Sequence, residues 1–262
     1  MNPQTLHLHT HKHILTITLA RPAKKNAMNF AMMRELISVA KHAKQDKSLR
    51  AIIITGGTDF CSGLDLAVFG SPTSMAIAAF ELIKPTPSLF QEVCLIWQSL
   101  PIPVIAVIDG VCLGAGLQLA LGADMRISSP QARFAILEAK WGLVADMGLT
   151  HTAQGIRADT LKELAMSARL INSDTAYTSG LITHIHDEPM TQALVLATEF
   201  SQRSPDAVLA AKRLVNGMHK INTWALYQEK LWQLKLIAGY NRTLAIKKAK
   251  DNSLSFIKRQ FK

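Results

Sequence analysis

The chain has 262 residues, of which 48% are hydrophobic and 18% are charged. This balance excludes an intrinsically disordered chain, a collagen-like repeat and a small disulfide-stabilised protein. Lysine and arginine outnumber the acidic residues by 29 to 19, and the resulting formal charge of +10 predicts a partner with negative charge. Nucleic acid, an anionic membrane surface and a phosphate-containing small molecule are the three candidates.

Much of the positive charge lies near the C-terminus. Residues 241–262 contain seven basic residues and one acidic residue, a net charge of +6, which leaves +4 for the first 240 residues. This basic tail is consistent with a solvated helical face, with contacts to phosphate groups or with RNA binding. Aromatic residues that could stack on bases are few there, so nucleic acid is not the expected partner.

The cysteines and the N-terminus indicate the compartment. Cys61, Cys94 and Cys112 are odd in number, lack CxxC spacing and have apolar neighbours, which predicts free thiols in a reducing compartment. The first twenty residues contain no charged segment followed by an apolar one, so no secretory signal is expected. The apolar stretch 104–123 is interrupted by Asp109, Gln118 and four glycines, which favours a strand, a turn and a buried helix over a membrane span. We therefore expect a cytoplasmic protein.

The first expected element is a strand over residues 14–19, where apolar residues alternate with threonine. Just before it, His7, His9, His11 and His13 recur at period two and would share one face of a continued strand. Metal binding and an exposed edge strand are the two interpretations. We favour the edge strand, because the spacing supplies neither a carboxylate nor a closed ligand set, and we predict no metal site.

The next elements are expected to form an α/β core. Asn29 is expected to cap a helix whose apolar stripe includes Met33, Leu36, Ile37 and Ala40. Apolar runs predict buried strands at 51–55 and 104–108, followed by a helix near 114–121 and a strand at 125–128. The segment 67–100 begins with Ser, Thr and Pro residues that indicate a loop.

From residue 158 onward the pattern becomes mainly helical. Ser173 is expected to cap a short helix that Gly180 ends, residues 181–185 form a strand-like piece, and Ser204 caps a helix that starts at Pro205. The last fifty residues are expected to form long, amphipathic, basic helices. The predicted organisation is an α/β core over residues 1–195 and a C-terminal helical region over 196–262.

Two glycine-containing loops, residues 60–66 and 109–118, each follow a predicted buried strand. A loop that leads from a strand into a helix exposes backbone N–H groups that can bind an anion or a developing oxyanion. Neither loop contains a Walker lysine, so a nucleotide-binding phosphate loop is not expected. Beside them, Cys61 is expected to pack beneath its loop and Asp65 to hold loop backbone.

Five motifs together are more specific than either loop. They are Arg21-Pro22-x3-Asn26-Ala27-Met28, Phe60-x2-Gly63-Leu64-Asp65-Leu66, Asp109-Gly110-x3-Gly114-Ala115-Gly116-x-Gln118-Leu119-Ala120, Phe134-x3-Glu138-x3-Gly142-Leu143 and Ala176-x3-Gly180-Leu181-Ile182. In order and spacing, over about residues 8–215, the chain resembles the crotonase superfamily of enoyl-CoA hydratases and isomerases. The resemblance implies an α/β crotonase-like spiral of ββα repeats with a C-terminal helical trimerisation region, often as a dimer of trimers. It also implies an acyl-CoA substrate and no separate cofactor.

The resemblance places an oxyanion hole at the backbone N–H groups of Leu64 and Ala115. Family members usually have glycine at the second position, but alanine keeps the donor. Two fixed amides that bind the thioester oxygen stabilise an enolate, and one such donor is typically worth about 2.7–4 kcal/mol.

The acidic residues decide which reaction the enolate undergoes. Hydratases of the family use two glutamates, whose positions match Gln118 and Glu138. Gln118 can orient water or substrate but cannot exchange a proton near neutral pH. The apolar neighbours of Glu138 predict a raised pKa.

Asp146 is similar to an aspartate that dienoyl-CoA isomerases of the family pair with the glutamate matching Glu138, in the context Gly142-Leu-Val-Ala-Asp-Met-Gly148. The third acidic residue of those isomerases would fall at Gln118 and is missing. Capping of the helix that follows Gly148 is the other interpretation of Asp146.

The resemblance implies an acyl-CoA enzyme that moves a carbon–carbon double bond, with Glu138 removing a proton and Asp146, or Glu138 itself, returning one. Hydration of trans-2-enoyl-CoA is the alternative, and a non-catalytic acyl-CoA-binding or RNA-binding protein is the third hypothesis. Lys24 and Lys25 lie where family members contact coenzyme A phosphates, although ordinary surface lysines would fit as well.

Overall fold

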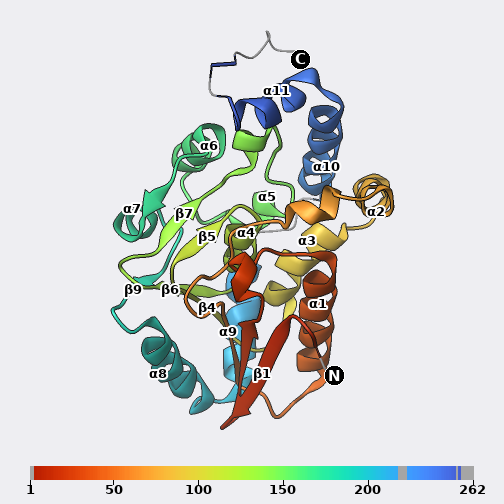
Figure 1. Ribbon diagram of the computed structural model, residues 1–262. Coiled ribbons are helices and arrows are strands. Elements are labelled where there is room, and N and C mark those ends of the chain that lie inside the picture. Colours follow the sequence, from red (N-terminus) through yellow and green to blue (C-terminus); the bar gives the residue numbers. More distant parts are fainter. Residues whose placement is uncertain (1–2, 218–222, 252, 255–262) are drawn as a thin grey trace.

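The computed structural model describes residues 3–217, 223–251 and 253–254, which form two β-sheets and the helices around them (Figure 1). The six-stranded sheet has the order β1-β2-β3-β4-β6-β9, and only its β1–β2 pair is antiparallel. Its strands are β1 (Leu6–His11), β2 (Ile14–Leu19), β3 (Ala51–Thr55), β4 (Val104–Ile108), β6 (Met125–Ser128) and β9 (His184–Ile185). The smaller sheet contains β5 (Val111–Leu113), β7 (Arg133–Ala135) and β8 (Ile171–Asn172).

Strand β3 shows why its sequence is apolar throughout. All five of its residues are buried. Ile52 and Ile54 belong to the main core, while Ala51 and Ile53 pack in a second cluster with Ala193 of α8 (Pro189–Ser201). Because side chains alternate along a strand, a sheet covered on both faces needs apolar residues at every position, and the predicted two-sided burial is confirmed.

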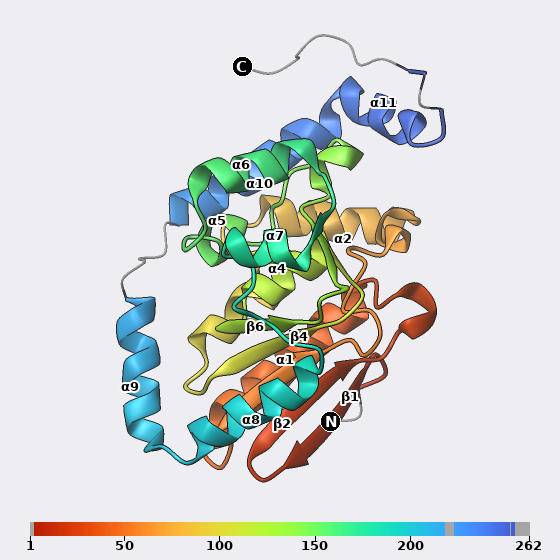
Figure 2. The same cartoon turned by 90° about the vertical axis from the view of Figure 1, so that its left-hand side faces the viewer.

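Helix α1 (Phe30–Gln45) covers the face of the sheet opposite α8 (Figure 2). The Asn29 side chain accepts a hydrogen bond of 2.9 Å from the Met32 amide and caps the helix, as predicted. The chain then repeats a strand–strand–helix order in β1-β2-α1, in β4-β5 with α4 (Ala115–Leu121), and in β6-β7 with α6 (Ala158–Ser167). This repetition agrees with the predicted spiral of ββα units.

The segment 67–100 differs from the prediction of a loop-like start. It forms the 3-10 helix η2 (Leu66–Phe69), α2 (Pro72–Ile83), α3 (Leu89–Leu95) and the 3-10 helix η3 (Ile96–Ser99). The hydroxyl of Ser71 accepts a hydrogen bond of 3.1 Å from the Ser74 amide, and Pro72 occupies the first helical turn. Ser, Thr and Pro are common both in loops and at the first turn of helices, so composition alone does not distinguish the two.

The C-terminal half contains two further corrections. Asn172, not Ser173, caps α7 (Ser173–Thr178), and the Ser173 hydroxyl instead donates a hydrogen bond of 2.7 Å to the Ser129 carbonyl. The strand expected over 181–185 is limited to β9. Ser204 caps α9 (Pro205–Asn216) as predicted. The expected domain boundary after residue 195 falls inside α8.

Helix α10 (Thr223–Ala238) lies beside α2, and both α10 and the following α11 (Tyr240–Lys248) lie away from the β1–β2 hairpin (Figures 1 and 2). Helix α10 is not the amphipathic helix that was expected, because Glu229, Lys230 and Gln233 are buried together with Leu226. The basic residues Lys258, Arg259 and Lys262 lie outside the described residues. Within the described chain, no helix is both long and apolar enough to cross a membrane.

The histidines near the N-terminus do not continue along one strand. His7, His9 and His11 lie on β1, whereas His13 lies in the following turn with a φ of +68°. The rings of His9 and His11 stack with their centroids 6.4 Å apart. Among the residues that the structure describes, no group of three or more His, Cys, Asp or Glu side chains is arranged to bind a metal ion.

Candidate active site

The two glycine-containing loops lie side by side. The Cys61 amide donates a hydrogen bond of 2.9 Å to the Val111 carbonyl, and the Leu113 amide donates one of 2.9 Å to the Cys61 carbonyl. Helix α4 approaches the first loop so closely that a β-carbon on Gly116 would lie 2.5 Å from the Cys61 carbonyl oxygen. Only glycine allows this approach, which brings the start of α4 next to Leu64.

The backbone N–H groups of Leu64 and Ala115 are both available for a ligand. Met28 forms backbone hydrogen bonds with the two neighbours of Leu64. Its amide donates to the Gly63 carbonyl, and its carbonyl accepts from the Asp65 amide. Ala115 is the first residue of α4, where an N–H has no partner within the helix. Neither N–H donates a backbone hydrogen bond within the described chain, and both residues line one cavity.

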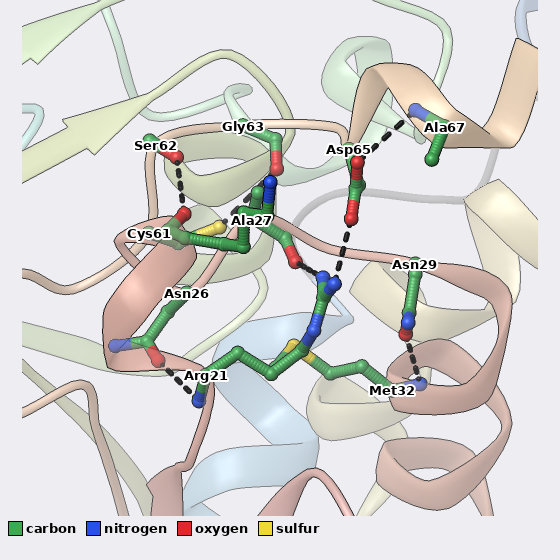
Figure 3. Close-up of polar contacts among 11 residues, drawn as sticks. Arg21, Asn26, Ala27, Asn29, Met32, Cys61, Ser62, Gly63, Asp65 and Ala67 are labelled. Carbon is green, nitrogen blue, oxygen red and sulfur yellow. Dashed lines mark hydrogen bonds and ion pairs between the residues drawn. The ribbon is translucent and has the colours of Figure 1, made fainter. Parts of the chain in front are cut away.

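Arg21 holds Asp65 of the first glycine-containing loop in place (Figure 3). Arg21 donates a hydrogen bond of 2.7 Å to the Asp65 carboxylate and another to the Ala27 carbonyl. Burial opposes ionisation of Asp65, but the hydrogen bonds from Arg21 and from the Ala67 amide lower its pKa. Asp65 therefore supports the loop, as the sequence predicted.

The cavity has a volume of about 630 Å³ and lies between these loops, the helix η4 (Glu138–Trp141) and the helices α2, α10 and α11. Most of its wall is apolar. The charged residues on the wall are Lys24, Asp65, Glu138, Asp146 and Arg242. A pocket of this size with a few polar groups fits a small organic ligand.

Glu138 lies on η4, close to the start of α4. A β-carbon on Gly114 would lie 3.4 Å from Oε1 of Glu138. The same Oε1 accepts a hydrogen bond of 2.7 Å from Nε2 of Gln118, whereas Oε2 is buried without a partner in the described chain. Burial raises the pKa of Glu138 to about 7, so the carboxyl group can both take and give a proton near neutral pH.

Gln118 is not on the cavity wall, in contrast to the expectation that it orients water or substrate. Its side chain is 1% exposed and lies behind Glu138. While Nε2 donates to Glu138, Oε1 accepts a hydrogen bond of 2.9 Å from the Met147 amide. The geometry therefore gives Gln118 a supporting place between two segments of the wall.

Asp146 is buried on the cavity wall. Burial raises its pKa well above the ordinary value, and the negative charges of Glu229 and Glu138 raise it further. The raised pKa favours the protonated carboxyl group, which is the form that can donate a proton. The alternative interpretation, that Asp146 caps the following helix, is wrong. The N-cap residue of α5 (Leu149–Thr152) is Gly148, and the Asp146 side chain forms no capping hydrogen bond with this helix.

Glu229 of α10 provides the missing cap and is a site residue that sequence reasoning missed. Its carboxylate accepts hydrogen bonds of 3.0 Å from the Gly148 amide and 2.9 Å from the Thr150 amide. It also accepts bonds from the Thr150 hydroxyl at 2.6 Å and from the Gln91 amide nitrogen at 3.2 Å. Burial raises the pKa of Glu229 as well. No local pattern marks a contact between residues about 80 positions apart.

The two lysines expected to contact phosphates differ in their surroundings. Lys24, the last residue of the 3-10 helix η1 (Pro22–Lys24), lines the cavity. Lys25 does not line it, and its Nζ atom lies 3.6 Å from a carboxylate oxygen of Asp59. Cys61 is fully buried and its pKa is raised to about 12 by burial, which agrees with the predicted packing role.

Sequence comparison connects this site with a known family. Residues 9–250 match the family described as enoyl-CoA hydratase/isomerase. The mitochondrial Delta(3,5)-Delta(2,4)-dienoyl-CoA isomerase of Mus musculus is 34% identical over 212 residues, which cover 77% of this chain and 65% of that protein. The match thus spans slightly less than two thirds of that relative's length.

Relatives named as hydratases are about as similar. The mitochondrial methylglutaconyl-CoA hydratase of Mus musculus is 30% identical over 253 residues, 93% of this chain and 76% of that protein. A probable enoyl-CoA hydratase of Mycobacterium tuberculosis is 32% identical over 219 residues, 82% of this chain and 84% of that protein.

Solved structures share the fold. The enoyl-CoA hydratase/isomerase from Pseudoalteromonas atlantica T6c superposes with a TM-score of 0.84 at 21% identity and covers 97% of this chain and 100% of that chain. Pseudomonas aeruginosa DspI superposes with a TM-score of 0.74 at 28% identity, over 82% of this chain and 87% of that chain. The two sheets and the C-terminal helices are therefore a known arrangement.

Proposed function

The chain belongs to the enoyl-CoA hydratase/isomerase family and has its crotonase fold, and from that premise we propose that it is an isomerase that moves a double bond in an enoyl-CoA or dienoyl-CoA. The observation that carries the proposal is the placement of two carboxyl groups on the wall of the cavity that Leu64 and Ala115 also line: Glu138, whose Oε2 atom is buried, and Asp146, which is buried as a whole. A double-bond shift needs one group that takes a proton and one that gives a proton, beside donors that stabilise an enolate.

The proposed reaction begins at the carbon next to the thioester. The thioester oxygen accepts hydrogen bonds from the N–H groups of Leu64 and Ala115, and Oε2 of Glu138 removes a proton from C2. The electrons of that C–H bond form an enolate conjugated with the double bond. Reprotonation at C4 of a 3-enoyl group, or at C6 of a 3,5-dienoyl group, yields the 2-enoyl or 2,4-dienoyl product with no net gain or loss of atoms.

Asp146 is the group assigned to the second proton transfer. Burial and the nearby charges of Glu229 and Glu138 raise its pKa, which favours the protonated form that can donate a proton to the enolate. Glu138 can return the proton itself if the acceptor carbon lies within its reach. The Asp146→Asn variant distinguishes the two mechanisms. It should stop the reaction if Asp146 returns the proton, but not if Glu138 does.

Hydration of trans-2-enoyl-CoA is the second candidate, and the similarity to proteins named as hydratases favours it. It would require Glu138 alone to activate water and to protonate the substrate. Hydration by two carboxylates lacks its second carboxylate here, because the matching residue is Gln118. Its amide is buried and already donates and accepts hydrogen bonds within the protein. Isomerisation needs no water at the site.

Two further parts of the proposal concern binding. Lys24, on the cavity wall, would contact a phosphate of coenzyme A, with Lys25 nearby at the surface. We also propose a homotrimer or a dimer of trimers. On α9, Leu214 is 75% exposed and Val215 is 61% exposed, and a neighbouring subunit could cover them.

The test is to incubate the protein separately with trans-3-hexenoyl-CoA, 3,5-octadienoyl-CoA and trans-2-hexenoyl-CoA in D2O and to follow the products by NMR. We expect migration of the double bond with one or both of the first two, and deuterium in the product. The Glu138→Gln variant should lose about 10²–10⁴-fold in rate. Hydration of trans-2-hexenoyl-CoA with no migration in the other two would overturn the proposal.

A further inference from the structure

Arg242 of α11 lines the cavity. The described residues form no ion pair with it, and its Nε atom is buried without a hydrogen-bond partner. The other buried basic groups differ. Lys212, for example, lies 2.7 Å from the Asp124 carboxylate, and Lys230 donates hydrogen bonds to backbone carbonyls. A buried donor without a partner in the protein points to a partner in the ligand.

The backbone holds Arg242 at this place. Gly142 ends the η4 helix with a φ of +68°, and a β-carbon there would lie 2.9 Å from the Cα atom of Arg242. Helix α11 therefore rests directly on the turn that follows Glu138. The position of Arg242 on the wall depends on the same segment that positions the proposed catalytic base.

The charge of Arg242 is not balanced by the acidic residues on the cavity wall. Asp65 is paired with Arg21 at 2.7 Å, and neither Glu138 nor Asp146 lies within ion-pair distance of Arg242. Trp141, Ile237 and Ile246 line the same cavity and provide an apolar surface. Beside this apolar surface, the guanidinium group of Arg242 has no ion-pair partner among the described residues.

We propose that Arg242 binds a carboxylate at the end of the acyl chain, so that the preferred substrate is an acyl-CoA whose acyl group carries a terminal carboxylate. This inference rests on the proposed acyl-CoA function. A guanidinium group matches a carboxylate with two parallel hydrogen bonds, and the apolar surface suits the methylene groups before it. Lys24, which the proposed function assigns to a coenzyme A phosphate, lines the same cavity as Arg242.

The test compares two saturated, unreactive ligands, hexanoyl-CoA and adipoyl-CoA, by calorimetric titration of the full chain. We expect adipoyl-CoA to bind at least tenfold more tightly to the native protein. Arg242→Gln should remove this preference while leaving the affinity for hexanoyl-CoA within about twofold, which also shows that the variant is folded. Arg242→Lys should keep part of the preference. Lys247→Gln, an exposed change on the same helix, should alter neither affinity.

Three outcomes would overturn the inference, and they are distinguishable. Equal affinity of the native protein for the two ligands would show that no group recognises the carboxylate, with the acyl-CoA function intact. An equal loss of both affinities in Arg242→Gln, accompanied by weaker binding of free coenzyme A, would assign Arg242 to a phosphate. Failure of every coenzyme A ester to bind would remove the proposed function itself.

Discussion

Gln118 donates a hydrogen bond of 2.7 Å from its Nε2 atom to Oε1 of Glu138. Because the Oε1 atom of Gln118 is held by the Met147 amide at 2.9 Å, the orientation of the side-chain amide is fixed. The hydrogen bond occupies one oxygen of Glu138 and leaves Oε2 without a partner in the described chain. A neutral amide behind the carboxyl group also adds no second negative charge, so Glu138 is the only titrating member of this pair.

The pH dependence of isomerisation should report the ionisation of Glu138. The base acts in its ionised form, and its pKa of about 7 lies well above the ordinary range for glutamate because of burial. We therefore expect kcat/KM to fall about tenfold for each pH unit below 7 as Glu138 becomes protonated. Glu138→Gln should lower kcat by about 10²–10⁴-fold. A rate that stays constant from pH 5 to pH 8 would rule out Glu138 as the base.

Replacing the amide of Gln118 with a carboxylate should move this pH profile. In Gln118→Glu, a second carboxyl group would lie about 3 Å from Oε1 of Glu138, where two like charges cannot both form without cost, and the pKa of Glu138 would rise. We expect the fall in kcat/KM to begin above pH 7, and hydration of trans-2-hexenoyl-CoA to increase by an order of magnitude or more from a low level. Steady-state rates from pH 5 to pH 9 measure both effects.

A neutral control separates charge from lost hydrogen bonds. Gln118→Met removes the bonds to Glu138 and to the Met147 amide without adding a charge. It should lower stability and rate but give no hydratase activity. The prediction would be contradicted if the native protein hydrates trans-2-hexenoyl-CoA rapidly and Gln118→Glu does not increase that rate. Gln118 would then not be the residue that favours isomerisation over hydration.

The parts of the site that the sequence predicts are those carried by local pattern. Strand β3 and the Asn29 cap follow from periodicity and cap chemistry, and the resemblance to a family located Glu138 and Asp146. Glu229 and Arg242 could not be found in this way. Each lies on a helix about 80–100 residues further along the chain than the segment of the site that it contacts. In addition, the buried polar residues of α10 resemble in composition those of a solvent-exposed helix face, so the sequence does not mark them as buried.

The proposed oxyanion hole can be tested through the backbone. Ala115 occupies the first position of α4, where proline is tolerated because its missing N–H has no helical partner. Ala115→Pro should therefore keep the helix but lower kcat by about 10²–10³-fold, the typical cost of one oxyanion donor. Ala115→Gly, which keeps the N–H, should stay within a few-fold of the native rate. Circular dichroism should show equal helix content, and equal rates for the two variants would exclude this amide.

Asp146 should lower stability at neutral pH while serving the reaction. Its pKa is raised in the folded protein, so the folded state binds the proton more tightly than the unfolded state. Between the unfolded pKa of about 3.9 and the folded pKa, each pH unit then costs about 1.4 kcal/mol of unfolding free energy. As the pH rises from about 4, the native protein should lose stability relative to Asp146→Asn, a variant that is also expected to lose isomerase activity. Thermal melting at these pH values measures the difference, and parallel pH curves would contradict the raised pKa.

Glu229 links the C-terminal helices to the proposed acid. Its charge raises the pKa of Asp146, and its carboxylate accepts the hydrogen bonds that hold residues 148–150. Glu229→Gln removes the charge, so the pKa of Asp146 should fall and the loss of isomerase rate at alkaline pH should begin at a lower pH. Because the amide has one accepting oxygen where the carboxylate has two, we also expect stability to fall by about 1.5–3 kcal/mol.

Gln233→Ala is the matched control for that variant. It removes the bond of 3.1 Å from the Val144 amide, one turn further along α10, without changing any charge near Asp146. It should reduce stability but leave the alkaline side of the pH profile in place. A shift of the alkaline side in both variants would show that loosening α10 is sufficient, whereas a shift only in Glu229→Gln identifies the charge of Glu229 as the cause.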